Sequence, residues 1–186
     1  MDDQRKRSGV RYLPAGSGTY LLVFRSNREK KVRVGRSGQL QVKPGFYLYV
    51  GSAFGPGGLA ARIRHHFCGC RKPHWHLDYV KSCLKREEVY FCAGEKMEHQ
   101  WAGRLCLVKG VRIPRPGFGS SDCTCVSHLF FAPSRKSLCR ILKEFQKLAG
   151  LVAARVTADN YNGQPEQVQA AEPVPVTALV RERKLT

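Results

Sequence analysis

The apolar residues in the first third of the chain come in short runs that turn-forming residues interrupt. Five-residue runs and period-two alternation are typical of β-strands that are buried on one face or on both. The strand candidates are Tyr20–Phe24, the alternating pairs Val32/Val34 and Leu40/Val42, and Phe46–Val50. Polar or glycine-containing turns separate them, the strongest being Pro44-Gly45. This region therefore predicts antiparallel strands with short connections.

The rest of the chain alternates helical and strand patterns. Leu59, Ile63 and Phe67 have the i, i+4, i+8 spacing of one helix face. Further helices are expected at Trp75–Leu84, Lys96–Val108 and from Ser134, a candidate N-cap, to Leu148, and further strands at Glu88–Ala93 and Ser127–Ala132. These elements predict an α+β domain whose central, mostly antiparallel sheet is flanked by helices.

Four segments are expected along the chain. Residues 1–15 are a basic flexible lead-in, 16–132 a domain, 133–149 a C-terminal helix and 150–186 a disordered tail. Hydrophobic residues make up 42% of the chain, which is enough for a packed core and excludes global disorder.

The chain is strongly basic, and the basic residues are concentrated in the part expected to fold. Among 186 residues, 32 are Lys or Arg and 14 are Asp or Glu, which gives a formal net charge of +18. Four bases and four acids cancel within residues 151–186, so 28 bases face 10 acids in residues 1–150. A charge of this size predicts a polyanionic partner, with nucleic acid first and an anionic membrane surface second.

Nothing in the sequence has the pattern of an export or membrane segment. The charged start, residues 1–7, is not followed by an apolar stretch, and the longest apolar runs are strand-sized. We therefore expect a cytoplasmic protein without membrane association, in which the eight cysteines are reduced thiols or metal ligands.

Two tyrosines and an Arg/His pair are candidates for chemistry. Tyr20 begins one expected strand and Tyr49 ends another; each alone is more typical of a packing residue with a solvated hydroxyl. Arg62 and His66 are one helical turn apart, where they share a helix face. Such a pair could grip a phosphate and transfer a proton, or belong to a solvated basic face.

Glu98 is a candidate metal ligand because it is one of few acids in a basic domain. A carboxylate there suits a divalent cation that faces a phosphate, although a surface ion pair is the simpler interpretation. Glu95 is the nearest competitor.

The Cys- and His-containing segments have weaker metal-binding patterns. Cys123-x-Cys125-x-x-His128 offers only three local ligands, and Cys68-x-Cys70 would have to add more from elsewhere. Structural zinc is therefore not expected, and a packed loop with buried thiols is favoured. The segment His74–Asp78 is likewise interpreted as a helix start in which Asp78 caps.

Taken in order, these segments resemble the GIY-YIG nuclease superfamily, and more closely a prokaryotic branch of it described only as a domain of unknown function. The similarity covers roughly residues 16–132. The segments that carry it are Gly18-Thr19-Tyr20, Pro44–Ala53, Arg62–His66, His74–Tyr79, Glu98 with Ala102, and Gly117–His128 followed by Leu129-Phe130-Phe131.

The resemblance implies a metal-dependent endonuclease, with DNA a better expectation than RNA as its substrate. The implied catalytic residues are Tyr20 and Tyr49 in the water-activating part of the site, Arg62 on the scissile phosphate, His66 (with His65 second) in the proton network, and Glu98 as the single protein ligand of Mg²⁺ or Mn²⁺. Because an ordinary tyrosine is a poor base at neutral pH, Tyr20 and His66 are assigned jointly to water activation, in an order left open. Neighbouring side chains expected to bind substrate are Arg64, His65, Lys72 and His76.

The chain departs from the superfamily pattern at three places. Thr19 replaces the usual Ile, which is a mild change if this residue mainly packs. An extra hairpin at about residues 26–43 separates the two tyrosine motifs. The assisting polar residue near the C-terminus has no clear counterpart, and a branch-specific site is its candidate substitute, formed by Asp78, Asp122, Cys123, Cys125 and His128.

Three functions remain open from the sequence. The first and favoured one is a metal-dependent DNA endonuclease in repair or processing. The second is a nucleic-acid-binding module that keeps the fold without cutting. The third is an interaction domain that zinc stabilises through the cysteines.

Overall fold

The fold is built on one antiparallel sheet. The computed structural model describes residues 16–67, 72–149 and 154–157. The strand order is β6-β4-β1-β5-β7, and each neighbouring pair is antiparallel. The five strands are β1 (Gly18–Ser26), β4 (Gly45–Ala53), β5 (Lys85–Ala93), β6 (Leu129–Ala132) and β7 (Ala154–Thr157). Because four helices accompany this sheet, the predicted α+β class is confirmed.

The central strand β1 is apolar on both faces because both faces of the sheet are covered. Tyr20, Leu22 and Phe24 belong to one core, and Leu21 and Val23 belong to the other. All five side chains are buried. This explains why the run is continuous, whereas a strand with one solvated face would alternate apolar and polar residues.

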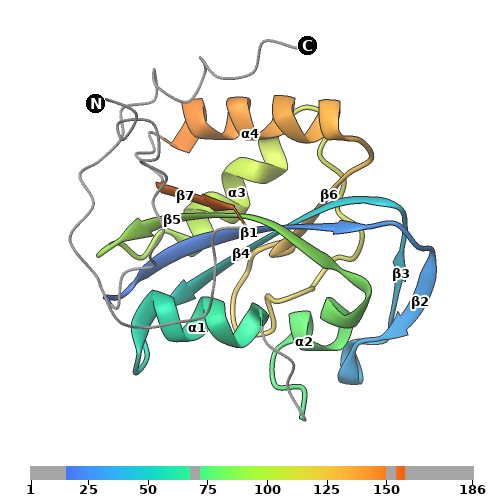
Figure 1. The fold of residues 1–186 in the computed structure, drawn as a ribbon, viewed down its shortest axis with the longest axis horizontal. Coiled ribbons are helices and arrows are strands. Elements are labelled where there is room, and N and C mark those ends of the chain that lie inside the picture. The colour runs from blue at the N-terminus through green and yellow to red at the C-terminus, as the bar shows by residue number, and fades with distance from the viewer. Residues whose placement is uncertain (1–15, 68–71, 150–153, 158–186) are drawn as a thin grey trace, which may run out of the picture.

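Two pairs of helices cover the sheet. Figure 1 shows α1 and α2 on one side and α3 and α4 on the other. The helices are α1 (Gly58–Phe67), α2 (His76–Val80), α3 (Glu98–Leu107) and α4 (Arg135–Ala149). Leu59, Ile63 and Phe67 are buried on α1, as their spacing predicts. On α4, the Ser134 hydroxyl accepts a hydrogen bond from the Ser137 N–H (3.2 Å), which confirms Ser134 as the N-cap.

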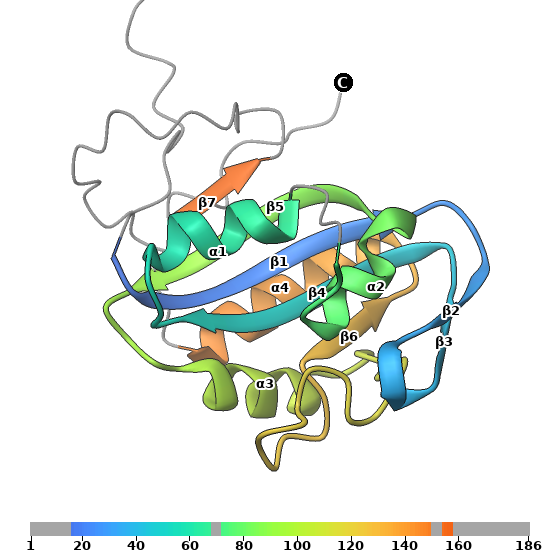
Figure 2. The same cartoon turned by 90° about the horizontal axis from the view of Figure 1, so that it is seen from below.

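The expected hairpin between the two tyrosine motifs is present. Strands β2 (Lys30–Arg33) and β3 (Gln39–Val42) pair into a separate two-stranded sheet, with a short 3₁₀ turn at Gly35–Ser37 between them. The hairpin extends past one end of the main sheet (Figure 2). Leu40 and Val42 are buried in the same core as α1 and α2, so the hairpin is packed onto the domain.

Two elements differ from the sequence-based expectation. The helix expected at Trp75–Leu84 is shorter: α2 ends at Val80 and a 3₁₀ turn, Lys81–Cys83, follows. The Lys81 ammonium is bound to Asp78 (3.0 Å) and to the His65 carbonyl (3.1 Å), and the chain tightens at this point into i→i+3 bonding. Within the tail expected at 150–186, residues 154–157 form strand β7 on β5.

The other parts of the lead-in and tail predictions, residues 1–15 and most of 150–186, lie outside the described residues. Among the residues that the structure describes, no helix combines the length and apolar character that crossing a membrane requires.

Candidate functional site

A cavity of about 420 Å³ opens where β1 begins and β4 ends. Four of the five side chains predicted to be catalytic line it: Tyr20, Tyr49, Arg62 and Glu98. The other lining residues are Gly51, Ser52, Phe54, Gly55, His74, Trp75, His76, Lys96, Gly119, Ser121 and Asp122. The fold therefore brings together groups from two strands, three helices and the loop before β6.

The fifth predicted residue, His66, lies directly behind the cavity. Its Nε2 is 2.9 Å from the Tyr20 hydroxyl oxygen, and its ring packs against the ring of Tyr49 with centroids 5.7 Å apart. His66 lies one turn after Arg62 on α1, and β1 and β4 run antiparallel beneath this helix. The i, i+4 spacing on α1 thus places one side chain in the cavity and its neighbour against the two tyrosines.

Close packing fixes the position of Tyr20. It pairs in register with Gly51 on β4, and a Cβ atom at Gly51 would lie 2.4 Å from the Tyr20 hydroxyl oxygen. At Gly18, a Cβ atom would lie 2.3 Å from the Cys92 carbonyl oxygen on β5. The glycines of both tyrosine motifs are therefore required because another strand or ring approaches their backbone closely.

Burial keeps Tyr20, Tyr49 and His66 neutral. It raises the pKa of Tyr20 well above the usual value, and the nearby Tyr49 raises it further. Burial also raises the pKa of Tyr49, with Glu98 adding to the effect. The same cause lowers the pKa of His66 to about 3. Tyr20 is therefore a neutral phenol at neutral pH, and His66 is a neutral imidazole that can accept its hydrogen bond.

Arg62 is oriented by an aromatic ring. Its guanidinium carbon lies 4.2 Å from the centroid of the Trp75 ring, within cation–π distance. Trp75 immediately precedes α2, so this contact joins α1 to α2 at the rim of the cavity. A guanidinium held over a ring has restricted freedom and presents its N–H groups in fewer directions, which suits an anionic oxygen in the cavity.

Asp78 holds the loop that carries Trp75 and so supports the contact between Trp75 and Arg62. Its carboxylate accepts hydrogen bonds from the N–H groups of His74 and Trp75 (both 3.0 Å) and contacts His65 and Lys81 (3.1 and 3.0 Å). Burial would raise the pKa of Asp78, but these hydrogen bonds outweigh it and hold the pKa well below the usual range. Asp78 therefore caps α2, as expected, and fixes the loop that carries Trp75.

Glu98, the first residue of α3, is held at both carboxylate oxygens. Oε2 accepts a hydrogen bond from the Ser52 hydroxyl (2.5 Å), and Oε1 lies 3.1 Å from Nδ1 of His128. Burial raises the pKa of Glu98, but the bonds from His128 and Ser52 lower it by more, so the group is ionised at neutral pH. The competing acid, Glu95, is exposed and does not line the cavity.

Thr19 positions the start of α3 and does not merely pack. Its hydroxyl donates to the Glu95 carbonyl and accepts from the Met97 N–H, both at 2.8 Å. The side chain is fully buried. The residue that departs from the superfamily pattern thus links β1 to the segment that carries Glu98.

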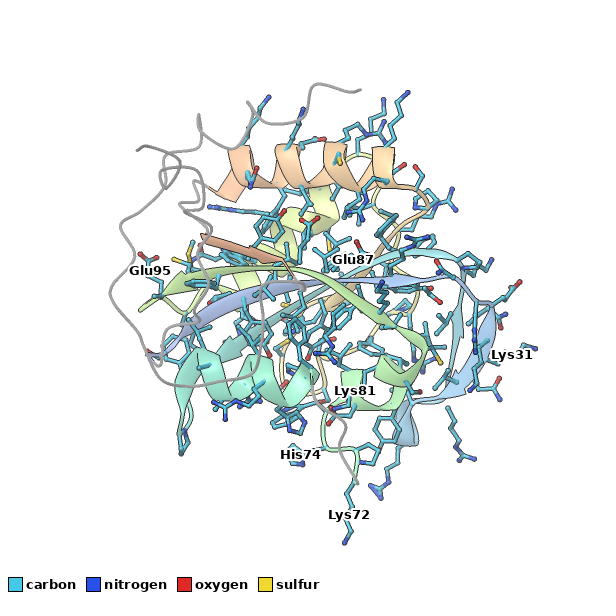
Figure 3. The ribbon with its side chains drawn as sticks, in the orientation of Figure 1. Lys31, Lys72, His74, Lys81, Glu87 and Glu95 are labelled. Carbon is cyan, nitrogen blue, oxygen red and sulfur yellow. The ribbon has the colours of Figure 1, made fainter. Side chains whose placement is uncertain are left out.

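The predicted substrate-binding residues lie in different places. His76 lines the cavity, and its Nδ1 accepts a hydrogen bond from the Gly119 N–H (2.7 Å). His65 is bound to Asp78, and neither it nor Arg64 lines the cavity. Lys72 is exposed and points away from the body of the domain (Figure 3).

The predicted branch-specific residues lie next to the cavity or line it. Asp122 lines it directly. Nε2 of His128 is 3.5 Å from the Cys123 sulfur, and the Cys125 sulfur is 3.3 Å from Nδ1 of His99 on α3. Asp78 is the exception, since it lies on the α2 side with His65.

Several residues of the site are not predicted from the sequence: Ser52, His74, Trp75, Lys96 and His99. Ser52 directly follows the glycine of the second tyrosine motif, and His74 and Trp75 belong to a motif that was interpreted as a helix start. His99 follows Glu98, and its contact with Cys125 spans 26 residues, so local spacing holds no signal for it.

Comparison with known proteins identifies a family without a known activity. A family model described as a domain of unknown function, DUF123, matches residues 19–151. Neither a curated protein nor a solved structure matches the chain.

Proposed function

The chain belongs to the DUF123 family, and from this premise we propose that it is an endonuclease that hydrolyses phosphodiester bonds of nucleic acid, DNA in particular, with a divalent metal ion. We further propose that the family is a branch of the GIY-YIG superfamily. One observation carries the proposal: Tyr20, Tyr49, Arg62 and Glu98 line a single cavity, and His66 is bonded to Tyr20 behind it.

The electrostatics of the site support a phosphodiester substrate. The domain carries 28 bases against 10 acids in residues 1–150, so a polyanion is attracted to it. Within the cavity, Arg62 and Lys96 supply positive charge, and Glu98 is the ionised carboxylate between Ser52 and His128. A carboxylate would repel a phosphate unless a cation lay between them, which favours catalysis with a metal over simple binding.

The donor set fits Mg²⁺ or Mn²⁺. An ionised carboxylate offers about four lone-pair positions, and Ser52 and His128 use two of them, which leaves room for a metal at Glu98. Mg²⁺ commonly binds through one or two carboxylates, with water and substrate oxygens as its other ligands. When bound, the ion would neutralise charge on the phosphate and on the leaving oxygen.

The protein side chains have separable roles in this reaction. Arg62, held against Trp75, places fixed N–H donors where negative charge develops on the phosphate. With Nε2 of His66 as acceptor, the Tyr20 O–H points toward His66, and the phenol oxygen keeps lone pairs that can orient a water in the cavity. Because burial raises the pKa of Tyr20 and lowers that of His66, neither a free phenolate nor an imidazolium is favoured, and we assign this hydrogen-bonded pair to orienting the attacking water.

A cleavage assay tests the proposal. Supercoiled plasmid and branched DNA are incubated with the wild type and with Glu98→Ala, Glu98→Gln and Arg62→Ala, in Mg²⁺ or Mn²⁺. Each substitution is expected to lower the cleavage rate at least about 100-fold, because each removes charge stabilisation from the site. DNA binding, measured by gel shift, is expected to persist in the Glu98 variants.

Matched controls identify the responsible charges. Glu95→Gln changes an exposed acid three residues away, and Arg140→Ala removes an exposed arginine from α4 on the other side of the sheet. Both are expected to cleave at the wild-type rate. Cleavage that persists in the Glu98 and Arg62 variants belongs to another site or to a contaminant. Tight DNA binding by a wild type that cuts with neither metal would favour the binding module.

A further inference from the structure

Four potential metal ligands meet beside the cavity, outside the set used for phosphodiester cleavage. They are His99 on α3 and Cys123, Cys125 and His128 on the segment before β6. One ligand atom from each lies within 4.8 Å of all the others. We propose that these four side chains bind a zinc ion and that the ion joins α3 to the segment between residues 117 and 128.

The distances between ligand atoms are close to those of a tetrahedral zinc site. With zinc–sulfur bonds of about 2.3 Å and zinc–nitrogen bonds of about 2.0 Å, a sulfur and a nitrogen ligand lie about 3.5 Å apart. The Cys123 sulfur is 3.5 Å from Nε2 of His128, and the Cys125 sulfur is 3.3 Å from Nδ1 of His99. These two sulfur–nitrogen pairs therefore already have the separation of a tetrahedral site, and the remaining pairs of ligand atoms lie within 4.8 Å.

The orientation of His128 supports the same conclusion. Its Nε2 faces the cysteines, and its Nδ1 lies 3.1 Å from Oε1 of Glu98. A histidine that binds zinc through one ring nitrogen commonly donates its other N–H to a carboxylate, which fixes the ring. Glu98 occupies that carboxylate position, so the zinc site and the cavity share one boundary.

The ligand types select zinc over the cation expected at Glu98. Two thiolates and two imidazoles suit Zn²⁺, whereas Mg²⁺ prefers oxygen ligands. The expectation from sequence alone was against structural zinc because only three ligands are local to Cys123–His128. The fold adds the fourth ligand from α3, 24 residues earlier in the chain than Cys123.

The segment between residues 117 and 128 has few internal connections that would hold its conformation. Residues 117–128 contain no helix or strand, and few backbone bonds cross them, among them Gly117 N–H to the Val126 carbonyl (2.8 Å) and His128 N–H to the Phe118 carbonyl (2.8 Å). A zinc ion that binds two cysteines and a histidine within six residues would supply the missing connections. Its release is expected to loosen this segment and lower the unfolding temperature.

Zinc content of the full-length protein tests the proposal without reference to nuclease activity. The protein is purified under reducing conditions without chelators, and its zinc content is measured by inductively coupled plasma mass spectrometry. We expect about one zinc per chain in the wild type. The variants Cys125→Ser and His99→Ala are expected to retain less than about a fifth of it, because each loses one of four ligands. Cys139→Ser, an exposed cysteine on α4, and His74→Ala are matched controls that keep the full amount.

Cobalt substitution gives a second measurement that a protein with weakened folding would not mimic. Co²⁺ added to the reduced, zinc-free wild type is expected to produce the intense visible bands of a tetrahedral ion and a thiolate charge-transfer band. Both are expected to be absent in Cys125→Ser and present in Cys139→Ser. A wild type that binds neither metal overturns the proposal, as does zinc that remains at the wild-type amount in both ligand variants.

Discussion

Gly51 shows how closely the geometry of the proposed catalytic site depends on single atoms. A Cβ atom there would lie 2.4 Å from the Tyr20 hydroxyl oxygen and 2.5 Å from its Cζ, and Tyr20 is only 2% exposed. Gly51→Ala is therefore expected to displace the Tyr20 ring from His66. We expect about 1–3 kcal/mol of lost stability from overpacking and a loss of cleavage that exceeds what lower stability explains. Urea unfolding and initial cleavage rates measure the two effects.

Gly103→Ala is the matched control for this substitution. Gly103 lies within α3, is exposed, and a Cβ atom there would meet nothing within 4 Å. Alanine in an open helix position is expected to stabilise the protein by about 0.5–1 kcal/mol and leave the cleavage rate unchanged. If Gly51→Ala behaves in the same way as Gly103→Ala, the close packing of Tyr20 on β4 is not what holds the site.

His66 predicts a pH dependence of stability. Burial lowers its pKa from 6.5 to about 3 in the folded protein, so the unfolded chain binds the proton more tightly. This contribution to stability is complete above about pH 6.5 and is lost as the pH falls from there toward the folded pKa, by up to about 1.4 kcal/mol per pH unit. The charged or polar groups that face His66 are Tyr20, Tyr49, His65, Asp78, Arg62 and Lys81.

A comparison of variants isolates this effect from the carboxylates, which also lose stabilising interactions in acid. The free energy of unfolding is measured from about pH 7 to pH 5 for the wild type and for His66→Gln. The wild type is expected to lose stability more steeply, and the difference in slope is the contribution of His66. Parallel curves would mean that the imidazole is solvated or already charged in the folded protein.

At the scale of elements, the sequence predicted the sheet better than the site. Continuous apolar runs located β1 and β4, and period-two alternation located β2 and β3, because strands with apolar core faces have a local signature. The end of α2 could not be predicted in this way, since it depends on contacts of Lys81 with Asp78 and with the His65 carbonyl, from another helix. Pairing of β7 with β5 likewise depends on a surface that only the folded sheet offers.

The residues of the site also fall into two groups: those with a signal in the local sequence and those without one. Tyr20, Tyr49, Arg62, His66 and Glu98 were selected because they occupy motif positions in order along the chain. The approach of His99 to Cys125, or of Arg62 to Trp75, arises where α3 and α2 end up beside other segments. In neither contact are the two residues close in sequence, so a motif of a few residues could not predict it.

The connection between β1 and α3 yields a prediction at this scale. Thr19→Val keeps the shape of the side chain but removes the hydroxyl that bonds the Glu95 carbonyl and the Met97 N–H. A loss of about 1–3 kcal/mol is expected because the buried partners are left unsatisfied. We also expect faster hydrogen exchange at the Met97 N–H and slower cleavage, since Glu98 is the next residue. Thr19→Ser keeps the hydroxyl and is expected to restore both; equal exchange in the two variants would refute the link.

At the scale of the whole molecule, positive charge lies on both sides of the sheet. Arg64 and Lys72 belong to the side with α1 and α2, and Lys136 and Lys143 are exposed on α4 on the other side. Net charge alone therefore does not say which side binds a polyanion. The proposed function assigns the polyanion to the side with α1 and α2, because Arg62, His74 and Trp75 at the rim of the cavity come from α1 and from the segment that leads into α2.

The salt dependence of DNA binding separates these two sides. Binding through backbone phosphates releases counterions, so about six contacts would weaken the affinity about a thousand-fold between about 50 and 200 mM salt. Removing a lysine or arginine that contacts a phosphate lowers the slope of log K against log salt by about one. The double variant Arg64→Ala/Lys72→Ala is expected to lower this slope by up to about two, whereas Lys136→Ala/Lys143→Ala, with the same change of net charge, leaves it unchanged.

Fluorescence anisotropy measures the slope for each variant on two duplexes of unrelated sequence. For a given variant the two duplexes are expected to give the same slope, because phosphates carry no sequence information. Equal losses in the two double variants would show that the domain attracts DNA by its net charge, without a binding face at the cavity.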